Sequence, residues 1–340
     1  MTTTLRILAF VSAVAIFSLP VLGQTDRANL EGTVTDASGA TMSGVTLQIL
    51  EVATNQSLER KSNAEGFYRF PGLAVGRYTL TVSSAGFKSK VIENVVLQVG
   101  ETRTLDVQLA VGLANEKVEV KADLSPAERS TAEQSIVISD DQIINLPNNG
   151  RDWASFTLLA PFAQDDGGGD QRTIRFAGRA RDDNNFTFDG VDAGGIQEQA
   201  QKSQTRLQIS QDAIEEYRVD SVLYDAEYGT QAGGQINVVT KSGSNDLHGT
   251  IFAYLRNSAF DARNFNDFDV NGRPAIPPFR LGQYGMTLGG PMVKDKTFFF
   301  VNYEGLRQFQ GATTQNAVPS ASIELAALTQ SPQLCSILQA

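Results

Sequence analysis

The residues of this chain that could carry chemistry are few. Its 340 residues include one histidine, His248, and one cysteine, Cys335. A zinc site with two histidines therefore cannot be built from it. A Ser/His/Asp triad would have to use His248, which lies where an alternating strand is expected to start. Gly167–Gly169 lacks the Gly-Lys-Ser/Thr that completes a phosphate-binding loop. We predict no catalytic residue, no metal and no cofactor, and a chain that is not an enzyme.

Carboxylate and amide side chains gather around one glycine-rich stretch. Asp165 and Asp166 precede the glycines, Asp170 follows them, and a second acidic pair lies at Asp182 and Asp183. Oxygen ligands of this kind can bind calcium, although their spacing does not follow that of an EF-hand loop. Solvated surface loops are the alternative interpretation of the same residues.

The clearest element pattern lies in the C-terminal third. Segments 282–290 and 297–304 alternate between apolar and other residues, and segment 248–255 does so before them. Segments of about ten residues with this period are typical of outer-membrane barrel strands. The long connection 257–279 and the short turn 290–295 fit long extracellular loops and short periplasmic turns. The edge of a soluble β-sandwich is the alternative. Apolar side chains that share a face are Ile251, Ala253, Leu255, Tyr284, Met286, Leu288, Phe299, Val301 and Tyr303.

Composition and the N-terminus indicate an exported protein. The formal net charge is -10 and no basic stripe is present, so the sequence gives no support for nucleic-acid binding. Residues 5–22 form an apolar run with Arg6 near its start, and small residues follow it. This pattern predicts a signal peptide over residues 1–23, cleaved before Gln24.

Residues 24–112 read as a small β-sandwich, because about seven short strands are separated by glycine and asparagine turns. Gly32–Asp36 and Ala64–Phe70, followed by Gly76 and Tyr78, resemble the carboxypeptidase regulatory-like domain. That resemblance implies a transthyretin-like sandwich of a carbohydrate-binding-like fold class, without implying peptidase activity. Three aromatic residues could contact a sugar or belong to the core, namely Phe67, Tyr68 and Tyr78.

Residues 113–245 mix helices and strands. Ser139–Gln142 has the pattern of a capping box, so a helix is expected to start there and to end at Leu146-Pro147. A second helix is expected over Arg151–Leu159. Strands are expected at 186–188, 214–222 and 235–240.

The ordered motifs of this segment resemble the plug domain of TonB-dependent outer-membrane receptors. They are Arg175–Gly178, Phe188–Val191, Ile214–Val219 and Ala232–Gly243. The last resembles the junction between plug and barrel, where the glycine pair would allow a tight bend before a strand along the barrel wall.

The plug resemblance assigns two kinds of site. Glu116–Ala122 resembles the box that pairs with periplasmic TonB as an added strand, and an ordinary linker is the alternative. The candidate box residues are Glu116, Lys117, Val118, Glu119 and Val120. Apical plug loops in this family face the incoming substrate, which makes Asp165, Asp166 and Asp170 candidate ligand contacts.

The C-terminal motifs Leu288–Pro291, Lys296–Phe300 and Tyr303–Gly305 resemble the Oar-like subgroup of these receptors. The expected fold is mainly β: the transthyretin-like sandwich, then the α/β plug, then the first strands of an incomplete transmembrane β-barrel over 246–310. Residues 311–340 are expected to be a truncated segment. Because family barrels have about 22 strands, we expect the N-terminal part of a longer receptor.

The expected function is substrate uptake gated by the plug and energised by TonB. The expected location is the outer membrane of a Gram-negative-type bacterium, with the N-terminal domains in the periplasm. TonB and outer-membrane lipid are the expected partners, with an unidentified substrate for which carbohydrate is one candidate. The main alternative is a secreted or periplasmic carbohydrate-binding sandwich without transport activity. An enzyme of the carboxypeptidase type is a third possibility, which the missing histidines count against.

Overall fold

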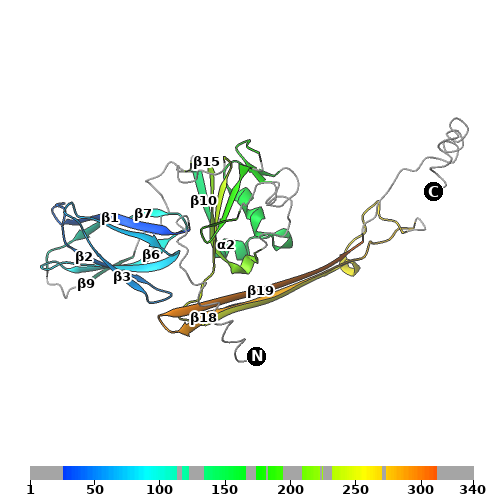
Figure 1. Cartoon of the computed structure of the whole chain (residues 1–340). Helices are drawn as coiled ribbons and strands as arrows, with labels where there is room; N and C mark the ends of the chain where they lie inside the picture. Colours follow the sequence, from blue (N-terminus) through cyan, green and yellow to red (C-terminus); the bar gives the residue numbers. More distant parts are fainter. Residues whose placement is uncertain are drawn as a thin grey trace, which may run out of the picture. The chain divides into compact units, whose positions relative to one another are not determined.

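The computed structural model describes residues 26–112, 117–121, 134–165, 174–180, 183–193, 209–222, 224, 232–269 and 273–311. These residues fold mainly into β-strands (Figure 1). None of the helices among them is long and apolar enough to cross a membrane. The predicted signal peptide and the segment after residue 311 lie outside the described residues.

The N-terminal sandwich consists of two sheets. In the first, β1 pairs with β4 in antiparallel fashion and with β7 and β8 in parallel fashion. The second has the order β3-β2-β5-β6-β9. The strands are β1 (Ala28–Asp36), β2 (Thr46–Glu51), β3 (Ser57–Lys61), β4 (Phe67–Leu73), β5 (Gly76–Ser83), β6 (Ser89–Leu97), β7 (Thr102–Thr104), β8 (Val107–Leu109) and β9 (Lys117–Lys121).

Alternation along these strands builds the sandwich core. On β5, Tyr78, Leu80 and Val82 are buried, while the residues between them are half-buried. The same period on β2 buries Leu47 and Ile49. Side chains at every second position of a strand lie on one face, so each sheet contributes one apolar face to a shared core.

Residues 102–109 form two short strands, β7 and β8, and not one continuous strand. The break lies at Leu105, whose N–H donates to the carbonyl of Glu31 at 2.7 Å and whose carbonyl accepts from the Tyr68 hydroxyl at 2.6 Å. A Cβ atom on Gly32 would lie 2.1 Å from the Leu105 carbonyl oxygen. Only glycine allows the two backbones to approach so closely.

The α/β segment is built on a five-stranded sheet of order β10-β15-β16-β13-β14. The strands β15 and β16 have the bounds that the sequence predicted. The elements are β10 (Gln134–Ser139), α2 (Asp140–Asn145), η1 (Asn149–Arg151), η2 (Trp153–Leu159), β11 (Ala163–Asp165), β12 (Ile174–Phe176), β13 (Asn185–Phe188), β14 (Val191–Asp192), η4 (Gln211–Ala213), β15 (Ile214–Val222) and β16 (Gln235–Thr240).

The helices of this segment agree with the sequence in place but not always in type. The capping box forms, with the Ser139 N–H donating to Gln142 Oε1 at 3.1 Å, and the cap at the other end of α2 is Leu146. The second predicted helix is instead two short 3₁₀ segments, η1 and η2. Gly150 lies inside η1 and has a φ of 77°, a value that an α-helix does not allow.

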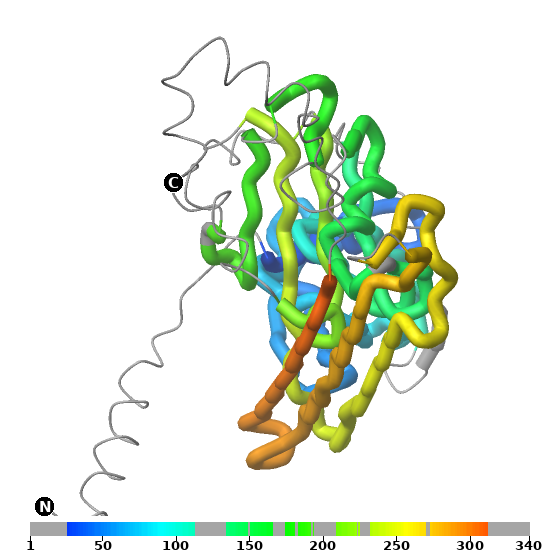
Figure 2. Tube along the Cα trace, turned by 90° about the vertical axis from the view of Figure 1, so that its right-hand side faces the viewer, coloured from blue at the N-terminus to red at the C-terminus, as the bar shows by residue number. Residues whose placement is uncertain are grey.

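A three-stranded antiparallel sheet of order β17-β18-β19 completes the described residues. Figure 2 shows these strands side by side, coloured from yellow to red-orange. They are β17 (His248–Asn257), β18 (Phe279–Val293) and β19 (Thr297–Gln310), and η5 (Ser258–Phe260) follows β17. All three strands are longer than the alternating segments predicted for them, and the short turn between β18 and β19 is Lys294–Lys296.

Candidate functional site

The two faces of the β17-β18-β19 sheet differ in chemistry. On β18, Gln283, Gly285 and Thr287 are buried, whereas Tyr284, Met286 and Leu288 are exposed. On β17, Ile251 is 87% and Leu255 90% exposed. Contacts confirm which residues share a face, because a Cβ atom on Gly282 would lie 3.7 Å from Leu255, and one on Gly305 would lie 2.8 Å from the Tyr284 ring. The exposed face is therefore the apolar one, as the sequence predicted.

Polar side chains pair on the opposite face. The hydroxyls of Thr250 and Thr287 lie 2.9 Å apart, and Gln283 Nε2 donates to Glu304 Oε1 at 2.5 Å. His248, at the start of β17, is exposed, and its Nδ1 lies 2.9 Å from the backbone carbonyl oxygen of Asp246. No carboxylate contact to this ring is recorded among the described residues, which gives no support for a triad.

The strand that comes before this sheet in the chain is β16, a member of the five-stranded α/β sheet. β16 lies between β15 and β13, so it is a central strand of that sheet and not a strand along a barrel wall. This corrects our expectation for the strand after the glycine pair. Gly233 and Gly234 also do not have a positive φ. They are needed for close approach, since a Cβ atom on Gly234 would lie 2.4 Å from the Phe176 ring.

One face of this sheet packs against the 3₁₀ helices. Trp153 makes edge-on contacts with Phe188 and Tyr217, at ring-centre distances of 5.8 and 5.3 Å. The Tyr217 hydroxyl donates to the carbonyl of Trp153 at 3.0 Å. Burial raises the pKa of this hydroxyl. Trp153 is 4% exposed, so the prediction that it belongs to the core is confirmed.

The other face of the sheet carries buried polar groups that the sequence analysis missed. Arg218 and Asp220 are 2% and 0% exposed, and Arg218 Nε lies 2.6 Å from Asp220 Oδ1. Burial raises the pKa of Glu216, on the same face of β15, to about 7. The sequence did contain a signal for this polar face, because charged residues occupy every second position of the predicted strand from Glu216 to Asp220.

Two ion pairs connect the ends of these elements. Arg151, the last residue of η1, pairs with Asp212 of η4. Lys241 directly follows β16, and its Nζ lies 2.7 Å from Asp140 Oδ1 at the start of α2. The Lys241 N–H also donates to the carbonyl of Ala213 at 2.8 Å. The chain is thus held to the α/β sheet at the point where it leaves for β17.

The candidate box lies on the sandwich. Lys117–Lys121 form β9, and the register pairs Lys117 with Ser89 and Lys121 with Glu93 of β6, in parallel. β9 is an edge strand, with β6 as its only strand partner among the described residues. Glu116 lies outside the described residues. The predicted extended conformation is confirmed for Lys117, Val118, Glu119 and Val120, but their role is not tested by it.

The candidate ligand contacts are described only in part. Asp165 is exposed and ends β11, opposite Ile174 of β12. Asp166 and Asp170 lie outside the described residues, as does the glycine-rich stretch between them. Within the described residues, no group of three or more His, Cys, Asp and Glu side chains is placed to hold a metal ion.

The aromatic residues considered for sugar contact are mostly core residues. Tyr68 and Tyr78 are 1% and 3% exposed, and burial raises the pKa of both hydroxyls. Phe67 alone of the three is exposed, at 39%. The sandwich therefore offers at most one of these rings to a ligand.

Comparison with known proteins finds two domain families in the chain. Residues 29–110 match the carboxypeptidase regulatory-like domain, and residues 239–338 match the outer membrane beta barrel domain. The TonB-dependent transporter Oar of Myxococcus xanthus is 27% identical over 304 residues, which are 84% of this chain and 27% of that protein. The chain thus spans about a quarter of the length of the curated relative it matches.

Similar solved structures include two siderophore receptors called PirA. The receptor from Acinetobacter baumannii is 21% identical, with a TM-score of 0.37, over 50% of this chain and 24% of that one. The receptor from Pseudomonas aeruginosa is 18% identical, with a TM-score of 0.34, over 48% of this chain and 26% of that one.

The domain matches and the relationship to Oar support an outer-membrane location, and they do not favour an isolated carbohydrate-binding module. Three findings now agree: the sandwich at residues 29–110, the sheet that leads into the β17-β18-β19 strands, and the apolar exposed face of those strands. The chain is homologous to the TonB-dependent transporter Oar and carries a carboxypeptidase regulatory-like domain and outer membrane beta barrel domain sequence.

Proposed function

We propose that this chain provides the sandwich, the plug and the first barrel strands of a TonB-dependent outer-membrane receptor. The observation that carries the proposal is the path of the chain. It passes from the central plug strand β16 through residues 241–247 directly into β17, where Ile251 and Leu255 are almost fully exposed. On the neighbouring strand β18, apolar residues are exposed and polar ones are buried, which suits a lipid environment outside and a polar interior.

In this proposal the chain catalyses no reaction on its substrate. Substrate binds from the outer face, and TonB supplies the energy by pulling on the N-terminal side of the plug. The substrate itself is not identified, and the buried Tyr68 and Tyr78 leave carbohydrate without specific support. Asp165 remains a candidate ligand contact, because it is exposed at the end of β11.

We assign TonB binding to β9. An edge strand bonded on one side presents a row of unpaired N–H and C=O groups on the other, and an extended peptide can add there. β9 meets this condition, since β6 is its only strand partner among the described residues. TonB would then extend the sandwich sheet beyond β9, or replace β6 as its partner.

Proline substitutions test this assignment. Val118→Pro and Val120→Pro remove N–H groups from one side of β9, and Glu119→Pro removes one from the other side, because N–H groups alternate along a strand. We expect each valine variant to weaken binding of the periplasmic domain of TonB about fivefold, since a lost hydrogen bond costs about 1 kcal/mol. Glu119→Pro should instead loosen the pairing of β9 with β6.

Binding is measured with the full chain, and hydrogen exchange of the β6 amides reports whether β9 remains paired. Normal TonB binding by all three proline variants would show that β9 is a linker. Unchanged β6 protection in Glu119→Pro, together with weakened TonB binding, would assign the free edge to the other set of N–H groups.

A further inference from the structure

The apolar face of the β17-β18-β19 sheet carries two arginines near the ends of the strands that lie away from the short turn. Arg280 lies two positions from Gly282 and four from Tyr284, so it shares their face. Arg307 lies two positions from Gly305, where an added Cβ atom would meet the Tyr284 ring on that same face. Both arginines are exposed. Among the described residues, neither has a carboxylate within ion-pairing distance.

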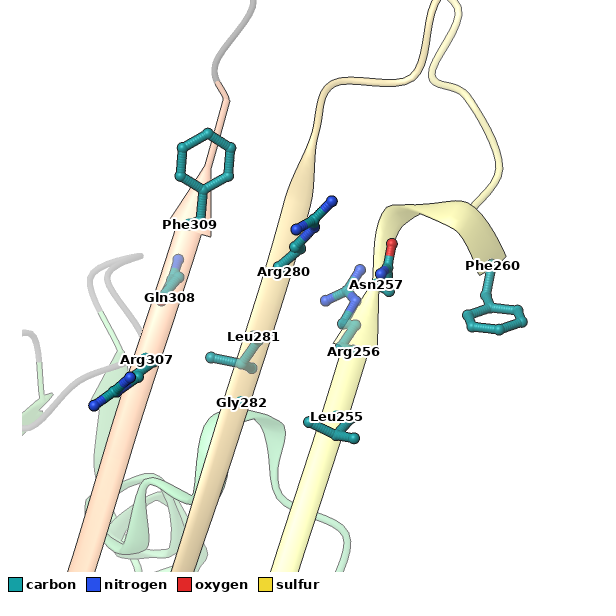
Figure 3. A pocket seen from close by; sticks show the side chains of 10 residues that line it. All are labelled: Leu255, Arg256, Asn257, Phe260, Arg280, Leu281, Gly282, Arg307, Gln308 and Phe309. Atoms are coloured by element: carbon teal, nitrogen blue, oxygen red, sulfur yellow. The ribbon is translucent and has the colours of Figure 1, made fainter.

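These arginines border a depression of about 510 Å³ on the sheet. Gly282 lies within it and has no side chain, which leaves space between neighbouring strands. Leu255 of β17 and Phe309 of β19 also line the depression. Figure 3 shows Arg256, Arg280 and Arg307 on three neighbouring strands.

The guanidinium of Arg256 already has two partners within the protein. It pairs with Asp261 at 3.4 Å and lies 5.0 Å from the centre of the Phe279 ring. Arg280 and Arg307 are therefore the two cations of the depression that remain available to an anion.

The position of the arginines along the strands matches the height of a bilayer core. Arg307 is ten positions after Thr297, the first residue of β19 after the turn. At about 3.4 Å per residue and a tilt of about 45°, ten positions rise about 24 Å. The apolar band of an outer-membrane barrel is about 25 Å tall. A turn at one interface therefore puts Arg307 at the other.

The residues below the arginines fit this placement. Val301 and Tyr303 share the face of Arg307 and are 53% and 54% exposed, and Tyr284 shares that of Arg280, nine positions from the turn end of β18 and so near the upper edge of the band. The position of Tyr284 fits the enrichment of tyrosine where the apolar core of a membrane meets its head groups. The connection 258–278 leaves the strands on the arginine side, as a long extracellular loop would.

We propose that Arg280 and Arg307 bind the phosphate of an outer-leaflet lipid head group, whose acyl chains pack on Leu255 and the apolar face below. A guanidinium at the membrane surface forms paired hydrogen bonds to phosphate oxygens and attracts their charge. The inference rests on the membrane placement of these strands and not on TonB binding, which the β9 variants test separately.

The test measures binding of dye-labelled diphosphoryl lipid A to the full chain in dodecyl maltoside micelles, by fluorescence anisotropy. Arg280→Gln and Arg307→Gln should each weaken binding about fivefold, and the double variant roughly 25-fold if their effects add. Arg280→Lys and Arg307→Lys keep the charge and should lose less. Arg273→Gln removes an exposed arginine of the connection that lies outside the depression and should change nothing.

Three results would overturn the proposal: equal binding of dephosphorylated lipid A, equal binding by the double glutamine variant, or displacement of the lipid by inorganic phosphate in excess. The last would indicate a site for free anions. Far-UV circular dichroism checks that each variant keeps its strand content. A variant that loses strand content is replaced by its lysine counterpart, whose retained binding supports the proposal and whose full loss of binding contradicts it.

Discussion

The sandwich and the β17-β18-β19 sheet are both built from strands in which apolar residues alternate with others, yet they expose opposite faces. In the sandwich, Leu80 and Val82 of β5 are 0% exposed, because a second sheet covers them. In the other sheet, Leu288 of β18 is 45% and Leu255 of β17 90% exposed, whereas Gln283 and Thr287 are buried. The same alternation of apolar residues thus forms a covered core in one sheet and an exposed apolar surface in the other.

The difference shows what the alternation itself encodes. A period of two places apolar side chains on one face of a strand, but it does not say what covers that face. The sandwich covers its own apolar faces and is complete. The β17-β18-β19 sheet leaves its apolar face to the surroundings, which in an outer membrane is lipid. The β10-β15-β16-β13-β14 sheet combines features of both. It has a buried apolar face around Trp153 and a buried polar face around Arg218.

The largest effect should come from a charge in the sandwich core. Leu80→Asp puts an unpaired carboxylate among fully buried side chains, and we expect it to cost more than about 4 kcal/mol and to unfold the sandwich. Limited proteolysis of residues 26–112 in the full chain measures the loss. Thr81→Asp, one position along β5 and half-buried on the other face, should keep the segment resistant. Equal sensitivity of both variants would contradict the two-faced strand.

The second prediction puts a charge on the apolar face of the β17-β18-β19 sheet. Val301→Arg should cost about 2–4 kcal/mol of insertion free energy, as cations on the lipid face of barrels do. Asn302→Arg lies on the opposite face of β19 and should cost much less. The fraction of full chain that sediments with dilauroylphosphatidylcholine vesicles after dilution from urea measures both. If the two variants insert equally, this face does not contact lipid.

The polar face of the plug should make stability depend on pH. Burial raises the pKa of Glu216 to about 7, above its unfolded value. Its neutral form therefore stabilises the folded plug at low pH, and this contribution is lost as pH rises through about 7. The upper limit of the effect is about 3 kcal/mol. Trp153 is the only tryptophan in the chain, so its fluorescence during urea unfolding reports on the plug. Glu216→Gln should remove most of this pH dependence; an unchanged slope in the variant would assign it to another group.

The smallest effect tests the close packing at the glycine pair. Gly234→Ala adds a Cβ atom 2.4 Å from the Phe176 ring and should destabilise the plug by about 1–3 kcal/mol. The same tryptophan signal measures it. Phe176→Leu in addition should recover part of the loss, because the smaller side chain leaves room. A full effect in the double variant would indicate backbone strain in place of the ring contact.

Much of the architecture could be predicted from local patterns. The bounds of β15 and β16 and the capping box at Ser139 were predicted correctly, because β-branched runs and a cap signal are local properties of the chain. The place of the second helix was also correct. Its 3₁₀ form did not follow from this local pattern.

The candidate sites were harder to predict from the sequence than the fold was. The extended form of β9 follows from its alternating valines, but its pairing with β6 joins residues 28 positions apart, Ser89 and Lys117. The pairing of Arg218 with Asp220 could have been suspected from their spacing on a predicted strand. Arg280 and Arg307 gave no local signal, because only the shared face of two strands brings them to one depression.

By itself, the sequence determined which segments are strands and which of their faces are apolar, because both follow from the period of side chains along an extended backbone. The tertiary structure decided what each strand lies against: β16 became the centre of the plug sheet, β9 an edge of the sandwich, and the apolar face of β17 to β19 an outer surface. Strand pairing is made by backbone hydrogen bonds between distant segments, and backbone groups are nearly the same in every residue. The order of strands in a sheet is therefore set by the whole fold.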